Sequence, residues 1–133
     1  MIATLFIRYL KGIGHGKGFG VQSPFAYEFV RMLRYGKRRM DNLTVEETII
    51  KKITDYFYDD VIVMSVSDTE GYHWDKSEKD VIIVTGIYDD DDSLDRWKRI
   101  CISPTVRMTF DLRYVGVVVN RRGLYKKDYI INY

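Results

Sequence analysis

Glycine occupies every second position from Gly12 to Gly20, in the stretch KGIGHGKGFG. A glycine-rich segment that leads into a helix is where many proteins hold phosphates and dinucleotides. The P-loop pattern requires four residues between its first glycine and Gly-Lys-Ser/Thr, but only three separate Gly12 from Gly16. The G-x-G-x-x-G pattern of dinucleotide sites fails in every frame, and no buried strand precedes the glycines. We therefore interpret residues 1–22 as a flexible segment with a glycine-rich linker.

An acidic run follows the apolar stretch at 81–88. Ligands of open α/β sheets bind at the carboxyl ends of strands, and adjacent carboxylates suit a hard cation such as Mg²⁺ or Ca²⁺. The run lacks the alternating spacing and the glycine of a calcium loop, however, and either Asp92 or Ser93 is more simply the N-cap of a helix. Weak metal candidates are Asp89, Asp90, Asp91 and Asp92. We expect no bound metal here.

Positive charge gathers at the end of the first predicted helix. The residues concerned are Arg31, Arg34, Lys37, Arg38 and Arg39. Cations at this position interact favourably with the helix dipole, which is the simpler interpretation. The alternative is a patch that contacts nucleic acid or an acidic partner.

The remaining reactive side chains are few. The lone cysteine, Cys101, excludes an internal disulfide and a cysteine-cluster zinc site, and its position beside Ile100 favours a buried, inert thiol. His15 and His73 are far apart in the sequence, so we do not expect them to share a ligand. We identify no catalytic or cofactor-binding residue.

Length and composition favour one folded domain. The chain has 133 residues, of which 46% are hydrophobic and 14% aromatic. The net charge of +2 conceals three blocks: residues 1–40 carry +7, residues 41–95 carry −12 and residues 96–133 carry +7. Such blocks can attract one another within one chain or between copies. The stretch MIATLFIRYL is too short and too charged for a signal peptide, and no segment is typical of a membrane span, so a cytoplasmic location without membrane contact is expected.

Two helices are predicted within residues 23–58. Ser23 is a suitable N-cap, and Pro24 occupies the first helical position, where its missing N–H costs nothing. The first helix has its apolar face at Phe25, Phe29, Met32 and Leu33, and Gly36 can end it. Thr44 and Glu47 form a capping box for the second helix, whose apolar residues are Ile49, Ile50, Ile53 and Phe57.

Residues 61–133 are typical of an α/β unit. Continuous apolar runs at 61–66 and 81–88 predict strands covered on both faces, joined by a polar loop at 67–80. A short helix follows, with Leu94, Trp97 and Ile100 on one face and Ser103-Pro104 at its end. The alternation at 106–112 predicts a strand covered on one face, and YVGVVVN and KKDYIINY predict a closing antiparallel hairpin around RRG.

Two stretches of the chain are similar to a family of class I S-adenosylmethionine-dependent methyltransferases. The first is FGVQSPF, in which Gly20, Ser23, Pro24 and Phe25 match a motif that precedes the family's first helix. The second is VIIVTGIYDDDDSLDRWKRI followed by VRMTFDLRYVGVVV, which matches in order and spacing. The resemblance covers about half of the chain. It implies an α/β fold with a reduced, Rossmann-type methyltransferase-like sheet, N-terminal helices and a C-terminal antiparallel hairpin.

The departures from this family affect the expected activity. The family's first strands, its glycine-rich cofactor loop and its acidic ribose ligand have no counterpart between the helices and the strand at 61–66. Thr85-Gly86 stands where the resemblance implies Asp-Asp. We therefore expect a non-catalytic, methyltransferase-like module without a cofactor, acting as a protein-interaction or remnant domain. One alternative is a small-ligand or nucleic-acid-binding protein that uses residues 31–39 and 89–92, and another is a residual methyltransferase.

The absence of the family's cofactor-binding half also predicts that the strand at 61–66 lies at an exposed edge of the sheet. The strand at 61–66 should pair in parallel with the strand at 81–88, and its outer side should lie where the first strand of the cofactor half would be. Unpaired backbone groups at such an edge invite pairing with another chain. We predict a homodimer that buries this edge or the Phe25/Phe29 helix face, with a different protein partner as a further possibility.

Overall fold

The computed structural model describes residues 23–133, so the glycine-rich segment and His15 lie outside the described residues. The helices are α3 (Pro24–Arg34), α4 (Val45–Phe57) and α5 (Asp91–Ile102). The strands are β1 (Val61–Ser65), β2 (Val81–Thr85), β3 (Met108–Asp111), β4 (Val115–Val119) and β5 (Lys127–Ile130). The predicted loop at 67–80 contains parts of two short 3₁₀ turns, at Val66–Thr69 and Trp74–Lys76.

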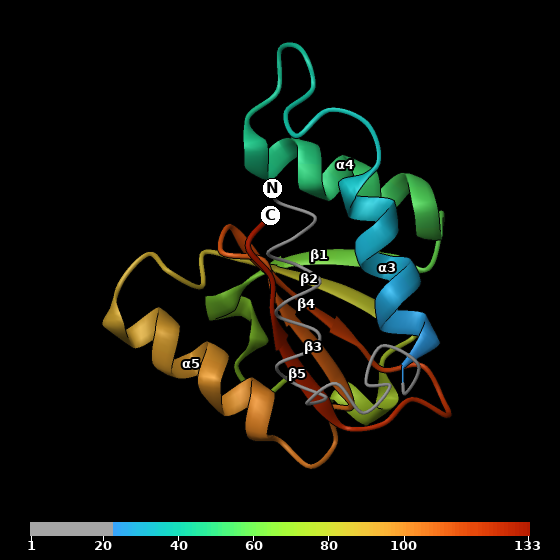
Figure 1. Ribbon diagram of the computed structural model, residues 1–133. Coiled ribbons are helices and arrows are strands. Elements are labelled where there is room, and N and C mark those ends of the chain that lie inside the picture. Colours follow the sequence, from blue (N-terminus) through green and yellow to red (C-terminus); the bar gives the residue numbers. More distant parts are fainter. Residues whose placement is uncertain (1–22) are drawn as a thin grey trace.

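The five strands form one open, mixed sheet in the order β1-β2-β4-β3-β5 (Figure 1). β1 and β2 are parallel neighbours, with Val61 opposite Val81, as predicted. β4 runs antiparallel to both of its neighbours, β2 and β3. The predicted α/β class is therefore confirmed.

The helices α3 and α4 start where the sequence places their caps. The Ser23 hydroxyl accepts a hydrogen bond from Ala26 N at 3.2 Å, and Pro24 opens α3. The Thr44 hydroxyl accepts from Glu47 N at 3.0 Å, and the Glu47 carboxylate accepts from Thr44 N at 2.8 Å, which completes the predicted capping box.

Each face of the sheet has its own apolar core. α3 and α4 cover one face, where Phe29 packs against Phe110 at a ring-centroid distance of 4.4 Å. α5 covers the other face and contributes the buried Trp97 and Ile100. Gly116 is required there, because a Cβ at this position would lie 2.5 Å from the Trp97 ring. Leu94 also packs on this side, so the predicted helix face is confirmed.

Three predictions about the strands are wrong. β5 does not form a hairpin with β4; it pairs in parallel with β3, because β4 already has a neighbour on each side. β3 is buried along its whole length rather than on one face, because Met108 and Phe110 lie in the core with α3 and α4 while Thr109 and Asp111 are covered by their partners Asp128 and Tyr88. β1 is not covered on both faces, because it is an edge strand in which Ile62 and Val63 are exposed.

Candidate functional site

The outer edge of β1 is open in the part of the chain that the structure describes. Ile62 and Val63 are 37% and 45% exposed, an unusual degree for apolar strand residues. The strand itself contains no proline or lysine that would discourage pairing. Of the two preceding acids, Asp60 is held inward, since its carboxylate accepts from Asp80 N at 2.8 Å and lies 3.6 Å from Arg121. Only Asp59 is left beside this edge.

The Phe25/Phe29 face is used within the molecule. Phe29 is 1% exposed and packs against Phe57 and Phe110, and Phe25 stacks on Phe29. This face belongs to the core, so its predicted use as a dimer surface is wrong. Of the two surfaces that the sequence suggested for self-association, the β1 edge remains.

The acidic run begins α5. Asp90 is the N-cap, in place of the predicted Asp92 or Ser93: its carboxylate accepts from Ser93 N at 2.7 Å, and this hydrogen bond lowers the Asp90 pKa. Asp92 lies 3.7 Å from Arg96, one turn later in the helix. Asp91 lies in the first turn, and Asp89 lies just before the cap. Within residues 23–133 no group of three or more His, Cys, Asp or Glu side chains is arranged to hold a metal ion.

A hydrogen-bonded network that the sequence did not predict lies near this run, at the carboxyl ends of β2 and β3. Tyr88 donates its hydroxyl proton to the carboxylate of Asp111, which is 7% exposed. Arg113 donates from Nη1 to the Tyr88 hydroxyl at 3.1 Å and from its backbone N to Asp111 at 2.9 Å. Burial, and then the bond to Asp111, raises the Tyr88 pKa, so this hydroxyl is a proton donor rather than a base.

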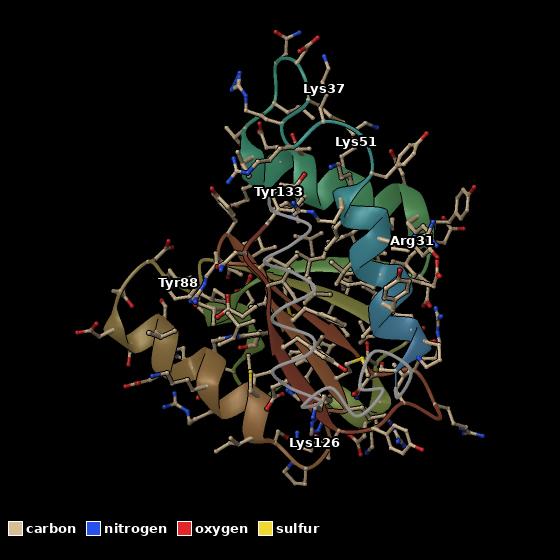
Figure 2. All side chains as sticks on the ribbon, in the orientation of Figure 1. Arg31, Lys37, Lys51, Tyr88, Lys126 and Tyr133 are labelled. Atoms are coloured by element: carbon tan, nitrogen blue, oxygen red, sulfur yellow. The ribbon has the colours of Figure 1, made fainter. Side chains whose placement is uncertain are left out.

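Most of the basic residues at 31–39 have partners within the described residues, and Arg39 is exposed after α3. Arg31 lies on the outer side of α3, whereas Lys37 lies in the loop that follows it (Figure 2). Arg31 is 3.6 Å from Glu28, and Lys37 is 3.5 Å from Asp41. Both ion pairs are exposed to solvent, where such pairs are weak, so a patch that contacts nucleic acid or an acidic partner stays a prediction.

Two of the basic residues bind the end of the described chain. Arg34 and Arg38 both donate to the main-chain oxygen of Tyr133, at 3.3 and 3.4 Å. The buried Lys52 ammonium completes this arrangement by donating to the Tyr133 hydroxyl at 2.7 Å and to the Leu33 carbonyl at 3.0 Å. Burial lowers the pKa values of Arg34 and Lys52. These contacts join α3, α4 and the segment after β5, which is a structural role.

The cysteine lies near the end of α5 and is partly buried. Burial raises the pKa of the Cys101 thiol to about 11, so the nucleophilic thiolate is scarce. The thiol is partly buried rather than buried, and its inertness stays a prediction. His73 lies just before the turn at Trp74–Lys76.

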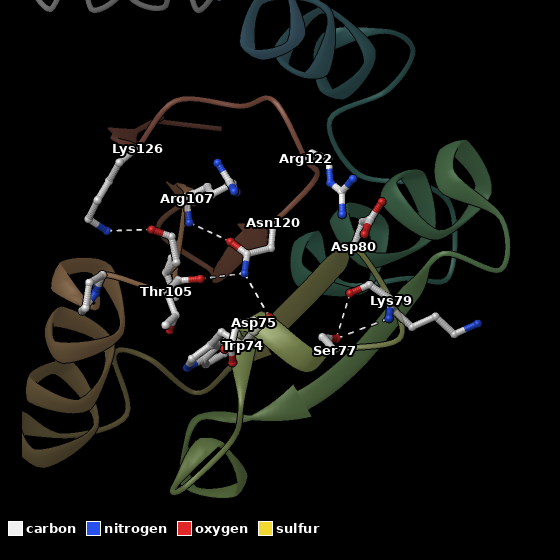
Figure 3. Close-up of a pocket in the computed structure, with 12 residues that line it drawn as sticks. Trp74, Asp75, Ser77, Lys79, Asp80, Thr105, Arg107, Asn120, Arg122 and Lys126 are labelled. Atoms are coloured by element: carbon white, nitrogen blue, oxygen red, sulfur yellow. Dashed lines mark hydrogen bonds between the residues drawn. The ribbon is translucent and has the colours of Figure 1, made fainter.

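A pocket of about 450 Å³ lies at the opposite, amino end of β2 and β3 (Figure 3). Asn120 joins its walls: the side-chain amide donates to the carbonyls of Trp74 and Thr105 at 3.0 and 2.8 Å, and its oxygen accepts from Arg107 N at 2.6 Å. Lys126 braces one side by donating to the carbonyls of Cys101, Ser103 and Val106 at 2.7, 2.9 and 2.8 Å. No local signal in the sequence marks this pocket, because its residues come from three separated segments.

The chain matches no protein-family model, no curated protein and no solved structure. None of the helices within residues 23–133 is both long and apolar enough to cross a bilayer.

Proposed function

We propose that this chain is a non-catalytic interaction module, built on a reduced methyltransferase-like sheet, that pairs with a second copy through the edge of β1. The observation that carries the proposal is the open edge, where Ile62 and Val63 expose apolar surface and the outer side of β1 pairs with no other strand of residues 23–133. This is the side on which the sequence resemblance implies the missing cofactor half.

The arrangement of the sheet supports the methyltransferase-like part of the proposal. The resemblance implies a parallel pair of strands, a helix that packs through a tryptophan, and antiparallel strands after it. β1 and β2 are parallel, α5 buries Trp97 at 3% exposure, and β4 is antiparallel to β3. Thr85 and Gly86, at the end of β2, supply no carboxylate where the resemblance implies two.

Symmetric pairing at β1 is compatible with the charges around it. If a two-fold axis passes through Val63 and the strands pair antiparallel, Asp59 of one copy lies opposite Ser67 of the other, and no two acids face each other. The pairing would join two five-stranded sheets into one and would cover Ile62 and Val63 of both copies.

The oligomeric state tests the proposal. Light scattering of the full chain at micromolar concentration should give a dimer, and Val63→Lys should dissociate it, because a buried lysine at the two-fold axis would face its own copy. The matched control is Ile102→Lys, which adds the same charge at a 73% exposed residue at the end of α5 and should leave the dimer intact. A wild-type monomer that stays unchanged across concentration would overturn the self-pairing.

The non-catalytic part has a separate test. S-adenosylmethionine and its demethylated product should give no heat of binding in titration calorimetry, because no described segment supplies the protein carboxylates that the resemblance implies for binding this cofactor. Micromolar affinity for either compound would instead favour a residual methyltransferase.

A further inference from the structure

The pocket at the amino end of β2 and β3 has a lining that is more basic than acidic. Four lysine or arginine residues and two aspartates line it, a net charge of +2. The basic residues are Lys79, Arg107, Arg122 and Lys126. One of the aspartates, Asp80, is also 3.6 Å from Arg121, which weakens its negative field in the pocket.

Much of this positive charge is not used by the protein. The Arg122 side chain makes no hydrogen bond or ion pair with any residue of 23–133. The Arg107 guanidinium donates one hydrogen bond within these residues, at 3.3 Å, to the carbonyl of Leu124. The Lys126 ammonium contacts only neutral carbonyls, so its charge is solvated but not neutralised. These three residues line the pocket, and Figure 3 shows Arg122 on the side of Asp80, whereas the Lys79 side chain points away.

The walls are fixed before any ligand arrives. Asn120 holds the segments at 74, 105 and 107 together, and Ser77 is held by the Tyr72 hydroxyl at 2.7 Å and the Lys79 carbonyl at 2.8 Å. A rigid pocket loses less entropy on binding than one that must first be assembled.

The shape of the pocket indicates more than a bare anion. Two guanidinium groups offer planar pairs of donors, which match the oxygens of a phosphate group. The volume of about 450 Å³ exceeds what one phosphate fills and lies within the range of small-molecule sites. Pro104, which is exposed, and the 7% of Trp74 that stays accessible supply a small apolar wall for an organic part.

We propose that this pocket binds a small phosphomonoester, with the phosphate at Arg107 and Arg122 and the organic part beside Trp74. Binding here is independent of the β1 edge. The pocket is also distinct from the dispersed basic residues at 31–39.

The experiment is an NMR titration of the ¹⁵N-labelled full chain with adenosine monophosphate, inorganic phosphate and adenosine. The monophosphate should shift the amides of 105–107 and 120–126 and bind more tightly than inorganic phosphate, while adenosine should bind weakly or not at all. If millimolar monophosphate leaves these amides unshifted, or if adenosine binds as well as the monophosphate, the proposal is overturned.

A charge-matched pair of double variants locates the site. Arg107→Gln/Arg122→Gln should weaken monophosphate binding about a hundredfold, roughly tenfold for each lost charge-assisted contact. Arg31→Gln/Arg39→Gln removes the same charge outside the pocket and should change the affinity by less than about twofold, since exposed charges are screened. Equal losses in both double variants would overturn the pocket.

Two further measurements keep the result interpretable. Thermal unfolding checks that the pocket double variant is folded; if it is not, Arg122→Gln alone should be, because its side chain has no partner within residues 23–133, and it should still lose about tenfold in affinity. A thymidine oligonucleotide supplies phosphodiesters instead of a monoester. Tighter binding of the oligonucleotide than of the monophosphate, lost in Arg107→Gln/Arg122→Gln, would identify a nucleic-acid surface at the pocket and overturn the proposal.

Discussion

The two ends of the sheet use polar residues in opposite ways. At the carboxyl end, Tyr88, Asp111 and Arg113 satisfy one another, and the Asp111 carboxylate is 7% exposed. At the amino end, Arg107 and Arg122 surround a cavity and keep most of their donors free of protein partners. Figure 2 shows the separation of the two ends, with Tyr88 and Lys126 far apart along the molecule.

This difference shows why the usual position of a ligand is not the best candidate here. Open α/β sheets bind ligands at the carboxyl ends of their strands. In this chain, Tyr88 and Asp111 are hydrogen-bonded to each other at that end, and Asp90 of the acidic run caps α5. Arg107 and Arg122, whose charges have no acidic partner within residues 23–133, and the pocket of about 450 Å³ lie at the other end. One end therefore contributes stability, and the other is available for binding.

The largest effect that this comparison predicts is on folding. Asp111→Ala removes the acceptor of both the Tyr88 hydroxyl and the Arg113 backbone N, and should lower the free energy of unfolding by about 2 kcal/mol. Asp75→Ala is the control: this aspartate lines the pocket and is exposed, and its loss should cost less than about 0.5 kcal/mol. Urea unfolding followed by circular dichroism measures both. Equal losses at the two ends would contradict the division between a closed end and an open one.

A smaller effect is expected from the residue that builds the pocket walls. Asn120→Ala deprives the carbonyls of Trp74 and Thr105 of a donor and should cost about 1 kcal/mol, because nearby water can replace part of these bonds. Hydrogen exchange of Arg107 N should become faster, since this amide loses its acceptor. Unchanged protection of Arg107 N would show that the pocket walls do not depend on Asn120.

Local signals were sufficient to predict much of the fold. Ser23 with Pro24, and Thr44 with Glu47, mark helix starts that depend only on residues within one turn. The apolar runs at 61–66 and 81–88 indicated β1 and β2, and even their parallel pairing followed from the resemblance. These features are encoded by neighbours in sequence, and so they are readable from it.

What the sequence did not predict depends on contacts between distant segments. Thr109 and Asp111 looked like the solvent-facing positions of β3, but Thr109 donates to Asp128 at 2.6 Å and Asp111 accepts from Tyr88. The alternation of residue types along a strand does not reveal partners from distant segments. For this reason the sequence predicted that β3 is covered on one face. The position of β5 was missed for the same reason, because the occupation of both sides of β4 is a property of the whole sheet.

The candidate binding sites, like the sheet, depend on contacts between distant segments of the chain. The acidic and basic runs were conspicuous in the sequence, yet the structure uses Asp90 as a cap and ties Arg34 and Arg38 to Tyr133. The pocket was not conspicuous, because Arg107, Asn120 and Arg122 are unremarkable in their own segments and meet only after β3 and β4 have paired. A cluster of charge along the chain is thus a poor guide to unsatisfied charge on the folded surface.

The smallest expected effect concerns pH and the closed end. Burial and the bond to Asp111 raise the pKa of Tyr88 above its ordinary value of 10.0, so the hydroxyl ionises at lower pH in the unfolded chain than in the folded one. The unfolded chain then releases the proton first, and the stability from Tyr88 is fully present below about pH 10 and is lost as the pH rises through the folded pKa. Tyr88→Phe removes this titration and should cost only about 0.5–1 kcal/mol at pH 7, because the side chain is partly exposed and water can bond to Asp111 in its place.

The test compares unfolding free energies of the wild type and Tyr88→Phe between pH 7 and pH 11. The difference between the two proteins should shrink as the pH rises above 10, whereas the contributions of Cys101, Tyr129 and Tyr133, whose pKa values are also raised, cancel in the comparison. A difference that stays constant or widens with pH would mean that Asp111 does not hold the Tyr88 proton. The carboxyl end would then be as open to solvent as the amino end, and the two ends would differ only in charge.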